Sequence, residues 1–177
     1  MKLMTLFYSL PLSNFQKGTT LLELMTVVGI VSIISALALT SLGTIIANNR
    51  RDNTLHELKT TLNYARIYAI KSNRYVTLCP YNGFKCASHW DGDIAVFIDK
   101  SNIGDIDNED TLLRVLEGHN DGRLSYQRHS LTFQPDGMVY VLGSGSFKYC
   151  HEQDEIQDKR ITVSQIGRTR LRDYDKC

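Results

Sequence analysis

Residues 24–47, LMTVVGIVSIISALALTSLGTIIA, form an uninterrupted run of 24 residues without a charged side chain. At about 1.5 Å per residue, a helix of this length spans about 36 Å, enough to cross the roughly 30 Å hydrocarbon core of a bilayer. The apolar region of a cleaved secretory signal is shorter and ends in a small-residue cleavage site, which is missing here. We therefore expect a membrane-spanning helix, and a plain membrane anchor is the simplest alternative.

The residues directly before this run are Lys17-Gly18-Thr19-Thr20-Leu21-Leu22-Glu23. A carboxylate at the edge of a membrane helix is costly unless it is paired, so Glu23 is a candidate functional residue. This segment resembles the prepilin signature of type IV pilins and type II secretion pseudopilins. The resemblance implies that a prepilin peptidase cuts after Gly18 and that Thr19 becomes the methylated N-terminal residue. It also implies that Glu23 pairs with the N-terminal amine of a neighbouring subunit in a filament, where both charges are neutralised.

This resemblance divides the chain into a prepilin leader (1–18), a transmembrane and filament-core helix (19–52) and an exported globular domain (53–177). Because the peptidase acts on the cytoplasmic side, the residues after the apolar run must lie outside the cytoplasm. The expected location is the bacterial inner membrane, as a single-pass protein with a periplasmic domain that becomes extracellular when the pilus assembles. Two departures from the family pattern are the long leader and Thr19, at a position that is usually aromatic.

The segment after the apolar run has the pattern of an amphipathic helix packed on β-structure. Small and large apolar side chains recur at helical spacing within Asn53–Asn73, and no glycine or proline interrupts this range, so the apolar helix can continue into it. Short β-like runs separated by turn residues follow: Tyr75–Cys79, Ile94–Ile98, Leu112–Leu116, Leu131–Phe133, Met138–Leu142 and Arg160–Ile166. The predicted fold class is α+β, with a long N-terminal helix packed on antiparallel sheet in a pilin-like arrangement.

Cysteine usage agrees with an exported domain, because all four cysteines follow the apolar run. Three pairings are possible, and we favour Cys79–Cys86, which closes a short loop, and Cys150–Cys177, which fastens the C-terminus. Neither a C-x2-C pair nor a matching Cys/His spacing is present, so we expect no metal and no cofactor. The histidines are scattered singly, as surface residues usually are: His56, His89, His119, His129 and His151.

Motifs of the globular part point to a narrower family. Trp90-Asp91-Gly92 is followed by the strand-like run Ile94–Ile98, and Phe133-Gln134-Pro135-Asp136-Gly137 comes later. These segments resemble the FimT/GspH family of minor pilins and pseudopilins. The acidic stretch Asp99–Asp110 favours a solvated hairpin loop over a calcium loop, because Ile103 stands where such a loop needs an oxygen ligand.

Charge is distributed unevenly along a chain whose formal total is only +1. Residues 91–121 contain nine acids and two bases, and residues 159–177 contain six bases and two acids. Within Gly167–Arg172 the arginines fall at every second position, so in an extended strand all three would project from one side, about 6.7 Å apart. Such a row suits the phosphates of a nucleic acid, since each guanidinium presents a planar fork of donors. Gly167 would permit a turn or a close backbone approach.

Two other interpretations compete for these arginines. They could protect an edge strand from aggregation, or they could pair with nearby acids. The acids in question are Glu152, Asp154, Glu155 and Asp158. However, Gly167, Arg168 and Arg170 resemble the Gly-Arg-x-Arg DNA-binding motif of FimT proteins that serve DNA uptake in natural transformation. Further basic residues extend the patch on chemistry alone: Lys159, Arg160, Arg172 and Lys176.

The predicted function is therefore a minor type IV pilin that binds extracellular DNA without reading its sequence. Its partners would be DNA, other pilin subunits, the prepilin peptidase and, before assembly, the inner membrane. The alternative is a structural pseudopilin of a type II secretion system that contacts other pilins or secreted proteins and not DNA. An enzyme is not expected, because the chain has no arrangement typical of nucleophilic catalysis and no phosphate-binding glycine loop.

Overall fold

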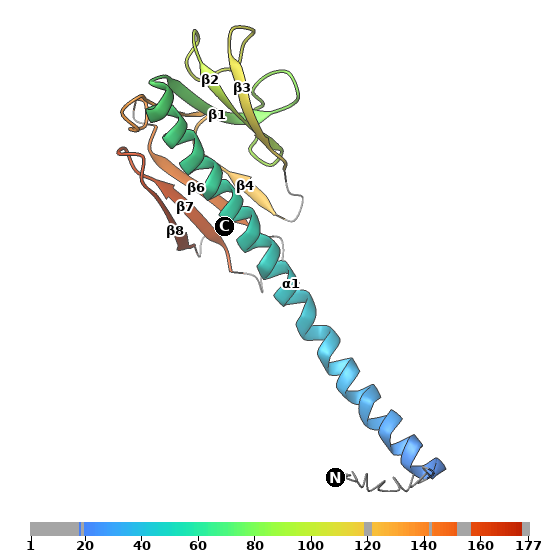
Figure 1. The fold of residues 1–177 in the computed structure, drawn as a ribbon. Helices are drawn as coiled ribbons and strands as arrows, with labels where there is room; N and C mark the ends of the chain where they lie inside the picture. The colour runs from blue at the N-terminus through green and yellow to red at the C-terminus, as the bar shows by residue number, and fades with distance from the viewer. Residues whose placement is uncertain (1–17, 19, 119–121, 142, 152–156, 175–177) are drawn as a thin grey trace, which may run out of the picture. The chain divides into compact units, whose positions relative to one another are not determined.

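The structure is a computed structural model that describes residues 18, 20–118, 122–141, 143–151 and 157–174, apart from the side chains of residues 37–41. The chain divides into two compact units, Met1–Ser41 and Leu42–Cys177. Helix α1 (Leu21–Ser72) contains residues of both units, so the apolar run does continue into the amphipathic segment as one helix (Figure 1).

The first unit contains the beginning of α1. Thr20 caps the helix, because its hydroxyl accepts a hydrogen bond from the Glu23 backbone N–H at 3.3 Å. The large apolar side chains from Leu21 to Ile34 are each more than half exposed. Within the part of the chain whose side chains are described, no helix is long and apolar enough to cross a membrane. Residues 37–41, inside the predicted membrane segment, have side chains that lie outside the described part.

The second unit contains two four-stranded antiparallel sheets (Figure 1). The first has the order β3-β2-β1-β5, with bounds β1 (Tyr75–Tyr81), β2 (Asp93–Asp99), β3 (Thr111–Leu116) and β5 (Leu131–Phe133). The second has the order β4-β6-β7-β8, with bounds β4 (Arg123–Ser125), β6 (Gly145–Cys150), β7 (Lys159–Val163) and β8 (Thr169–Asp173). Strand β8 is therefore an edge strand of the second sheet.

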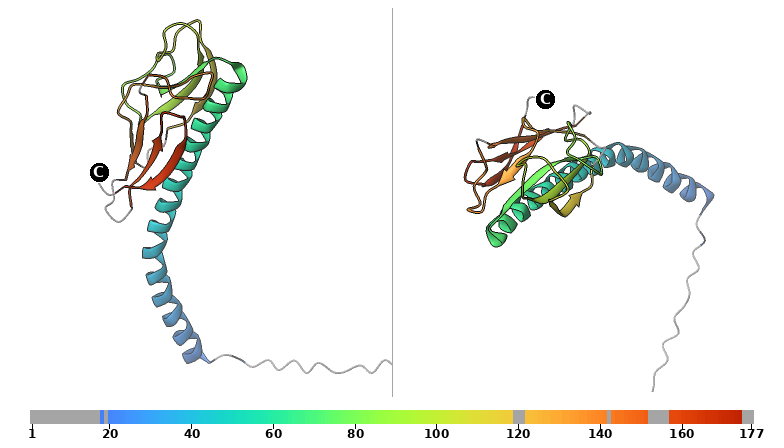
Figure 2. Two further views of the ribbon diagram at one scale, coloured as in Figure 1. Left: turned by 90° about the vertical axis from the view of Figure 1, so that its left-hand side faces the viewer. Right: turned by 90° about the horizontal axis from the view of Figure 1, so that it is seen from above.

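The core lies between the second half of α1 and both sheets (Figure 2). The apolar side chains that recur at helical spacing within Asn53–Asn73 form one stripe, which is fully or almost fully buried: Leu55, Leu58, Leu62, Ala65 and Ala69. It packs with Phe133 of the first sheet and with Phe147 and Ile161 of the second. This arrangement confirms the predicted α+β fold class and explains why the helix needs an apolar face.

The structure differs from the prediction at Met138–Leu142, which is not a strand. Val139 forms only an isolated bridge with Phe133, and its backbone N–H donates to the Gln165 carbonyl at 2.9 Å. This segment is therefore bonded both to β5, through the Tyr140 N–H and the Thr132 carbonyl at 2.8 Å, and to the β7–β8 turn, without forming a strand. Leu142 lies outside the described residues. Strands β4 and β6 were not predicted from the sequence.

Two smaller predictions are confirmed. Cys79 and Cys86 form a disulfide bond. The acidic stretch joins the paired strands β2 and β3 as a hairpin loop, and Asp110 accepts hydrogen bonds from the backbone N–H groups of Lys100 and Asp107 at 2.9 Å each. Cys150 also takes part in a disulfide bond. Its predicted pairing with Cys177 stays a prediction, since Cys177 lies outside the described residues.

Candidate nucleic-acid interface

The turn between β7 and β8 depends on a glycine. Gly167 has φ +73°, and its backbone N–H donates to the Ser164 carbonyl at 2.8 Å. A Cβ atom at this position would lie 2.2 Å from the Gly137 carbonyl oxygen. Because Arg66 of α1 donates to that same oxygen at 3.0 Å, the carbonyl is held in place. Gly167 thus provides both the turn and the close backbone approach that were predicted from the sequence.

Strand alternation places the arginines on the solvent face of the second sheet. Phe147, Ile161 and Val163 point into the core, so the alternate positions of β6, β7 and β8 face outward. We define the arginine face as Arg160, Arg168, Arg170 and Arg172. All four line a groove of about 440 Å³, together with Ser146, Thr162, Ser164 and Ile166.

The groove combines cationic and neutral hydrogen-bonding groups. In the β7–β8 register, Arg160 stands opposite Arg172, and Thr162 stands opposite Arg170. The hydroxyls of Ser146 and Thr162 lie 3.1 Å apart and form a hydrogen bond. A phosphate in this groove would therefore meet guanidinium donors on one side and hydroxyl groups on the other, which is the chemistry that recognises a nucleic-acid backbone.

Within the described part of the chain, no aspartate or glutamate neutralises the arginine face by an ion pair. None of the ion pairs formed by described residues includes Arg168, Arg170 or Arg172. Asp158, one of the four acids considered as partners, instead accepts a hydrogen bond from the His151 backbone N–H at 3.0 Å. The other three, Glu152, Asp154 and Glu155, lie outside the described residues.

Lys159 does not belong to the arginine face, contrary to the prediction that it extends the basic patch. It lies on β7 next to Arg160, so alternation turns its side chain away from the groove. Its ammonium group instead binds Asp52 of α1 at 2.8 Å. Asp52 also accepts from Arg51 at 2.9 Å, and only 6% of the Arg51 side chain is exposed. Lys176, another predicted member, lies outside the described residues.

The Arg51–Asp52–Lys159 cluster gives the stability of the protein a dependence on pH. Although burial alone raises the pKa of Asp52, hydrogen bonds from Arg51 and Lys159 lower it below its ordinary value of 3.8 overall. Ionised Asp52 therefore stabilises the fold at neutral pH, and this contribution is lost as the pH falls below 3.8 towards the lowered pKa.

We expect Asp52→Asn to lower the melting temperature at pH 7, and the difference from the wild type to shrink in acid. Calorimetry from pH 7 to pH 3 measures this, with exposed Asp91→Asn as control. A deficit that is the same at every pH would contradict it.

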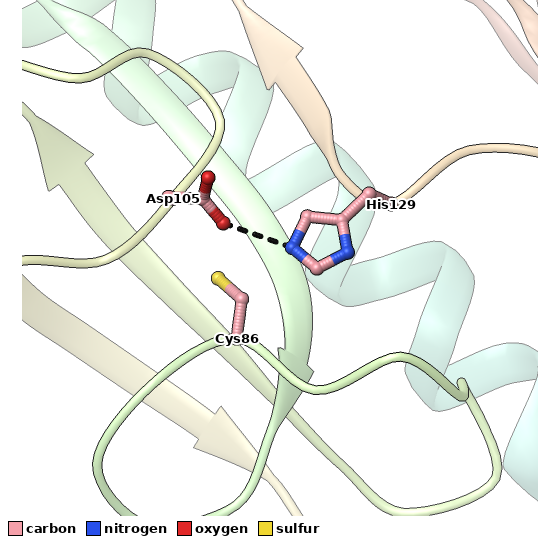
Figure 3. Close-up of side chains that lie close together, drawn as sticks. All are labelled: Cys86, Asp105 and His129. Carbon is pink, nitrogen blue, oxygen red and sulfur yellow. Dashed lines mark hydrogen bonds and ion pairs between the residues drawn. The ribbon is translucent and has the colours of Figure 1, made fainter.

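Cys86, Asp105 and His129 also come together, although they lie far apart in the sequence (Figure 3). His129 Nε2 and Asp105 Oδ1 are 2.9 Å apart, and about half of each side chain is exposed. The Cys86 sulfur belongs to the disulfide with Cys79, so it offers no thiolate to a metal. The sequence carries no local signal for this cluster, because its histidine and aspartate are separated by 24 positions.

The processing residues lie at the beginning of the described chain. Gly18 is exposed, Thr19 lies outside the described residues, and Glu23 is in the first turn of α1. A carboxylate in the first turn of a helix interacts favourably with the positive end of the helix dipole. Gly18 and Glu23 belong to the first unit, and the four arginines of the arginine face belong to the second.

Comparison with known proteins gives a family and a fold. The model of the family described as type II transport protein GspH matches residues 54–167. A crystal structure of the type IV minor pilin FimU from Pseudomonas aeruginosa is similar, with a TM-score of 0.58 and 20% identity, over 70% of this chain and 89% of the FimU chain. A second crystal form of FimU has a TM-score of 0.56 and 20% identity, over 68% of this chain and 91% of that one. No curated protein matches the chain.

Proposed function

Because the chain belongs to the GspH family of type II transport proteins, we propose that it is a minor type IV pilin that captures extracellular DNA for uptake in natural transformation. Its fold is pilin-like, as the similarity to FimU shows. Pilin-family proteins are structural, so we expect this protein to contact other pilin subunits whether or not it also binds DNA. DNA capture is the additional role that we assign to the arginine face.

The observation that supports DNA capture is the arginine face itself. Four arginines line one groove, and three of them are exposed and have no carboxylate partner among the described residues. Arginines that only protect an edge strand need not share a groove with the hydroxyl groups of Ser146 and Thr162, which come from strands β6 and β7. The turn at Gly167 sets the direction of β8, and the Thr169 hydroxyl at the start of this strand donates a hydrogen bond to Asn63 of α1 at 3.1 Å, which holds the arginine-bearing hairpin against the helix.

DNA binding through these residues would be independent of base sequence. Guanidinium and hydroxyl groups would contact phosphate oxygens, which position a nucleic acid but do not distinguish its bases. Each neutralised phosphate releases counterions, so three or four contacts predict a loss of about 10²-fold in affinity between 50 and 200 mM salt. Binding by one copy would therefore be weak, and several copies in one filament would strengthen it by avidity.

Export and assembly are part of the same proposal. Cleavage after Gly18 by a prepilin peptidase would leave Thr19 as the methylated N-terminus, with Glu23 available to a neighbouring subunit. The charge-free run 24–47 would hold the protein in the inner membrane until assembly. The globular unit would then be periplasmic, and extracellular once it is in the pilus. A disulfide bond between Cys79 and Cys86 agrees with an oxidising compartment.

A second function has one specific observation in its favour. The matching family is described as a type II transport protein, which points to a pseudopilin of a secretion filament. In that role the arginine face would contact an acidic surface of another pilin or of a secreted protein, and DNA would not be bound.

An experiment in the native bacterium separates the two functions. With Arg168→Gln and Arg170→Gln combined, we expect transformation frequency to fall by at least about tenfold, because two lost phosphate contacts weaken DNA binding by more than that. Protein secretion should be unchanged. The matched control is Lys85→Gln with Arg114→Gln, which removes two exposed charges from the loop after β1 and from β3 of the first sheet. Bacteria that carry this control should be transformed at the normal frequency. Lost secretion with normal transformation would favour the pseudopilin.

A further inference from the structure

Three cations stand side by side across the second sheet. Lys148 of β6 is opposite Arg160 of β7, and Arg160 is opposite Arg172 of β8. Neighbouring strands lie about 4.8 Å apart, so this row extends about 10 Å across the strands, perpendicular to the row Arg168, Arg170 and Arg172. Arg172 belongs to both rows. Lys148 is outside the Gly-Arg-x-Arg motif and belongs to no other motif of the sequence.

The aromatic ring of Tyr174 contacts two of these three cations. The Tyr174 ring centroid lies 5.3 Å from Lys148 Nζ and 5.4 Å from Arg160 Cζ. The backbone that carries the ring is tied to the start of β7, because the Tyr174 backbone N–H donates to the Asp158 carbonyl at 2.9 Å. A cation–π contact orients a cation without neutralising it, so both positive charges remain available to an anion.

Repulsion among the three cations lowers the stability of the second sheet when no anion is bound. Like charges directly opposite one another on neighbouring strands destabilise a sheet. No ion pair within the described chain includes Lys148, Arg160 or Arg172, and Arg160 Nε is buried without a hydrogen-bond partner there. An anion placed over the row would relieve the repulsion, whereas a purely structural row would be expected to contain acids as well.

We propose that Lys148, Arg160 and Arg172 form a second phosphate-binding row, which binds phosphodiester groups of the same nucleic acid. This inference rests on the proposed function and extends it to Lys148, which no motif marks. The two rows meet at Arg172, so the bound nucleic acid contacts an L-shaped set of cations over three strands, and not a single line along β8. Tyr174 is a positioning residue: it acts through Lys148 and Arg160 and does not need to touch the phosphate.

The test is a titration of the full chain, kept in solution with a mild nonionic detergent, against a fluorescently labelled DNA duplex between 50 and 200 mM salt. Lys148→Gln should weaken binding roughly fivefold to tenfold at 100 mM salt, and should reduce the slope of log affinity against log salt by about 0.9. Lys148→Arg keeps the charge and should keep the slope. Lys85→Gln removes an exposed charge from the loop after β1, and should change neither quantity.

Two further measurements distinguish binding from a structural role. Tyr174→Phe keeps the ring and should bind like the wild type, whereas Tyr174→Leu should weaken binding although no charge is lost. The melting temperature of Lys148→Gln without DNA should be unchanged or raised, because a repulsion is removed. A lower melting temperature together with a normal salt slope would assign Lys148 a structural role and overturn the inference.

The inference and the proposed function fail in different ways. If Lys148→Gln binds with the wild-type slope while Arg168→Ala with Arg170→Ala binds weakly, the second row is wrong and DNA binding by the arginine face stands. If the wild-type chain does not bind the duplex at 50 mM salt, the proposed function fails and the second row fails with it.

Discussion

Replacing Arg168 and Arg170 together by alanine is expected to weaken DNA binding roughly 60-fold at 100 mM salt. Each arginine that contacts a phosphate contributes close to tenfold through counterion release at this salt concentration, and the two contributions multiply. Both side chains are exposed and line the groove, so their removal leaves the core unchanged. Fluorescence anisotropy with a labelled duplex measures the dissociation constant directly.

The control for this variant removes the same charge elsewhere. Lys85→Ala with Arg114→Ala takes two exposed positive charges from the part of the molecule that contains the first sheet. If affinity followed only the total charge of the protein, both double variants would lose binding equally. That result would contradict a localised interface, whereas selective loss in the Arg168 and Arg170 variant supports one.

Gly167→Ala is expected to destabilise the globular unit by about 2–4 kcal/mol. An alanine at positive φ costs about 1–2 kcal/mol, and forcing a Cβ against packed backbone costs about as much again. The new atom would lie 2.2 Å from the Gly137 carbonyl oxygen, which Arg66 also binds. The melting temperature should fall by about 10 °C. DNA affinity should fall as well, because the turn presents Arg168.

Gly83 provides a matched control for the backbone strain. It also has a positive φ, +96°, but no atom lies within 4 Å of a Cβ built at this position. Gly83→Ala should therefore show only the cost of the conformation, and a smaller fall in melting temperature than Gly167→Ala. Equal losses in the two variants would mean that the contact between Gly167 and Gly137 contributes nothing to stability.

The helix and most of the first sheet could be predicted from the sequence, because local pattern determines them. The apolar stripe from Leu55 to Ala69 recurs at helical spacing and is buried as expected. The central strands β1 and β2 consist mainly of apolar residues, are buried along most of their length and are bounded by turn residues. The predicted run Leu131–Phe133 has the same bounds as β5, since the Pro135-Asp136-Gly137 turn follows it closely.

The second sheet was harder to predict because its strands are polar on one face. Strand β6 contains Gly145, Ser146 and Lys148 as well as the buried Phe147 and Tyr149, so its pattern is hidden by small and charged residues. Met138–Leu142 has the composition of a strand, but its hydrogen bonds are divided between β5 and the β7–β8 turn. Tertiary contacts decided both outcomes, as they often do for short strands.

Some residues around the arginine face could be predicted from the local sequence, and others only from the three-dimensional structure. Alternation placed Arg168, Arg170 and Arg172 on one side of the chain, and the structure brings all three into one groove. The hydroxyls of Ser146 and Thr162, and the cation Lys148, come from other strands, so only the sheet register reveals them. Lys159 was assigned to the patch by charge alone, but its pairing with Asp52 of α1 removes it.

The salt dependence of duplex binding by the unmodified protein tests DNA capture most directly. The four arginines should contribute about −3.6 to the slope of log affinity against log salt, and Lys148 about a further −0.9. The Arg168→Ala and Arg170→Ala double variant should have a slope that is shallower by about 1.8. Absence of binding at 50 mM salt, or a slope that is the same in both proteins, would contradict the assignment of DNA binding to the arginine face.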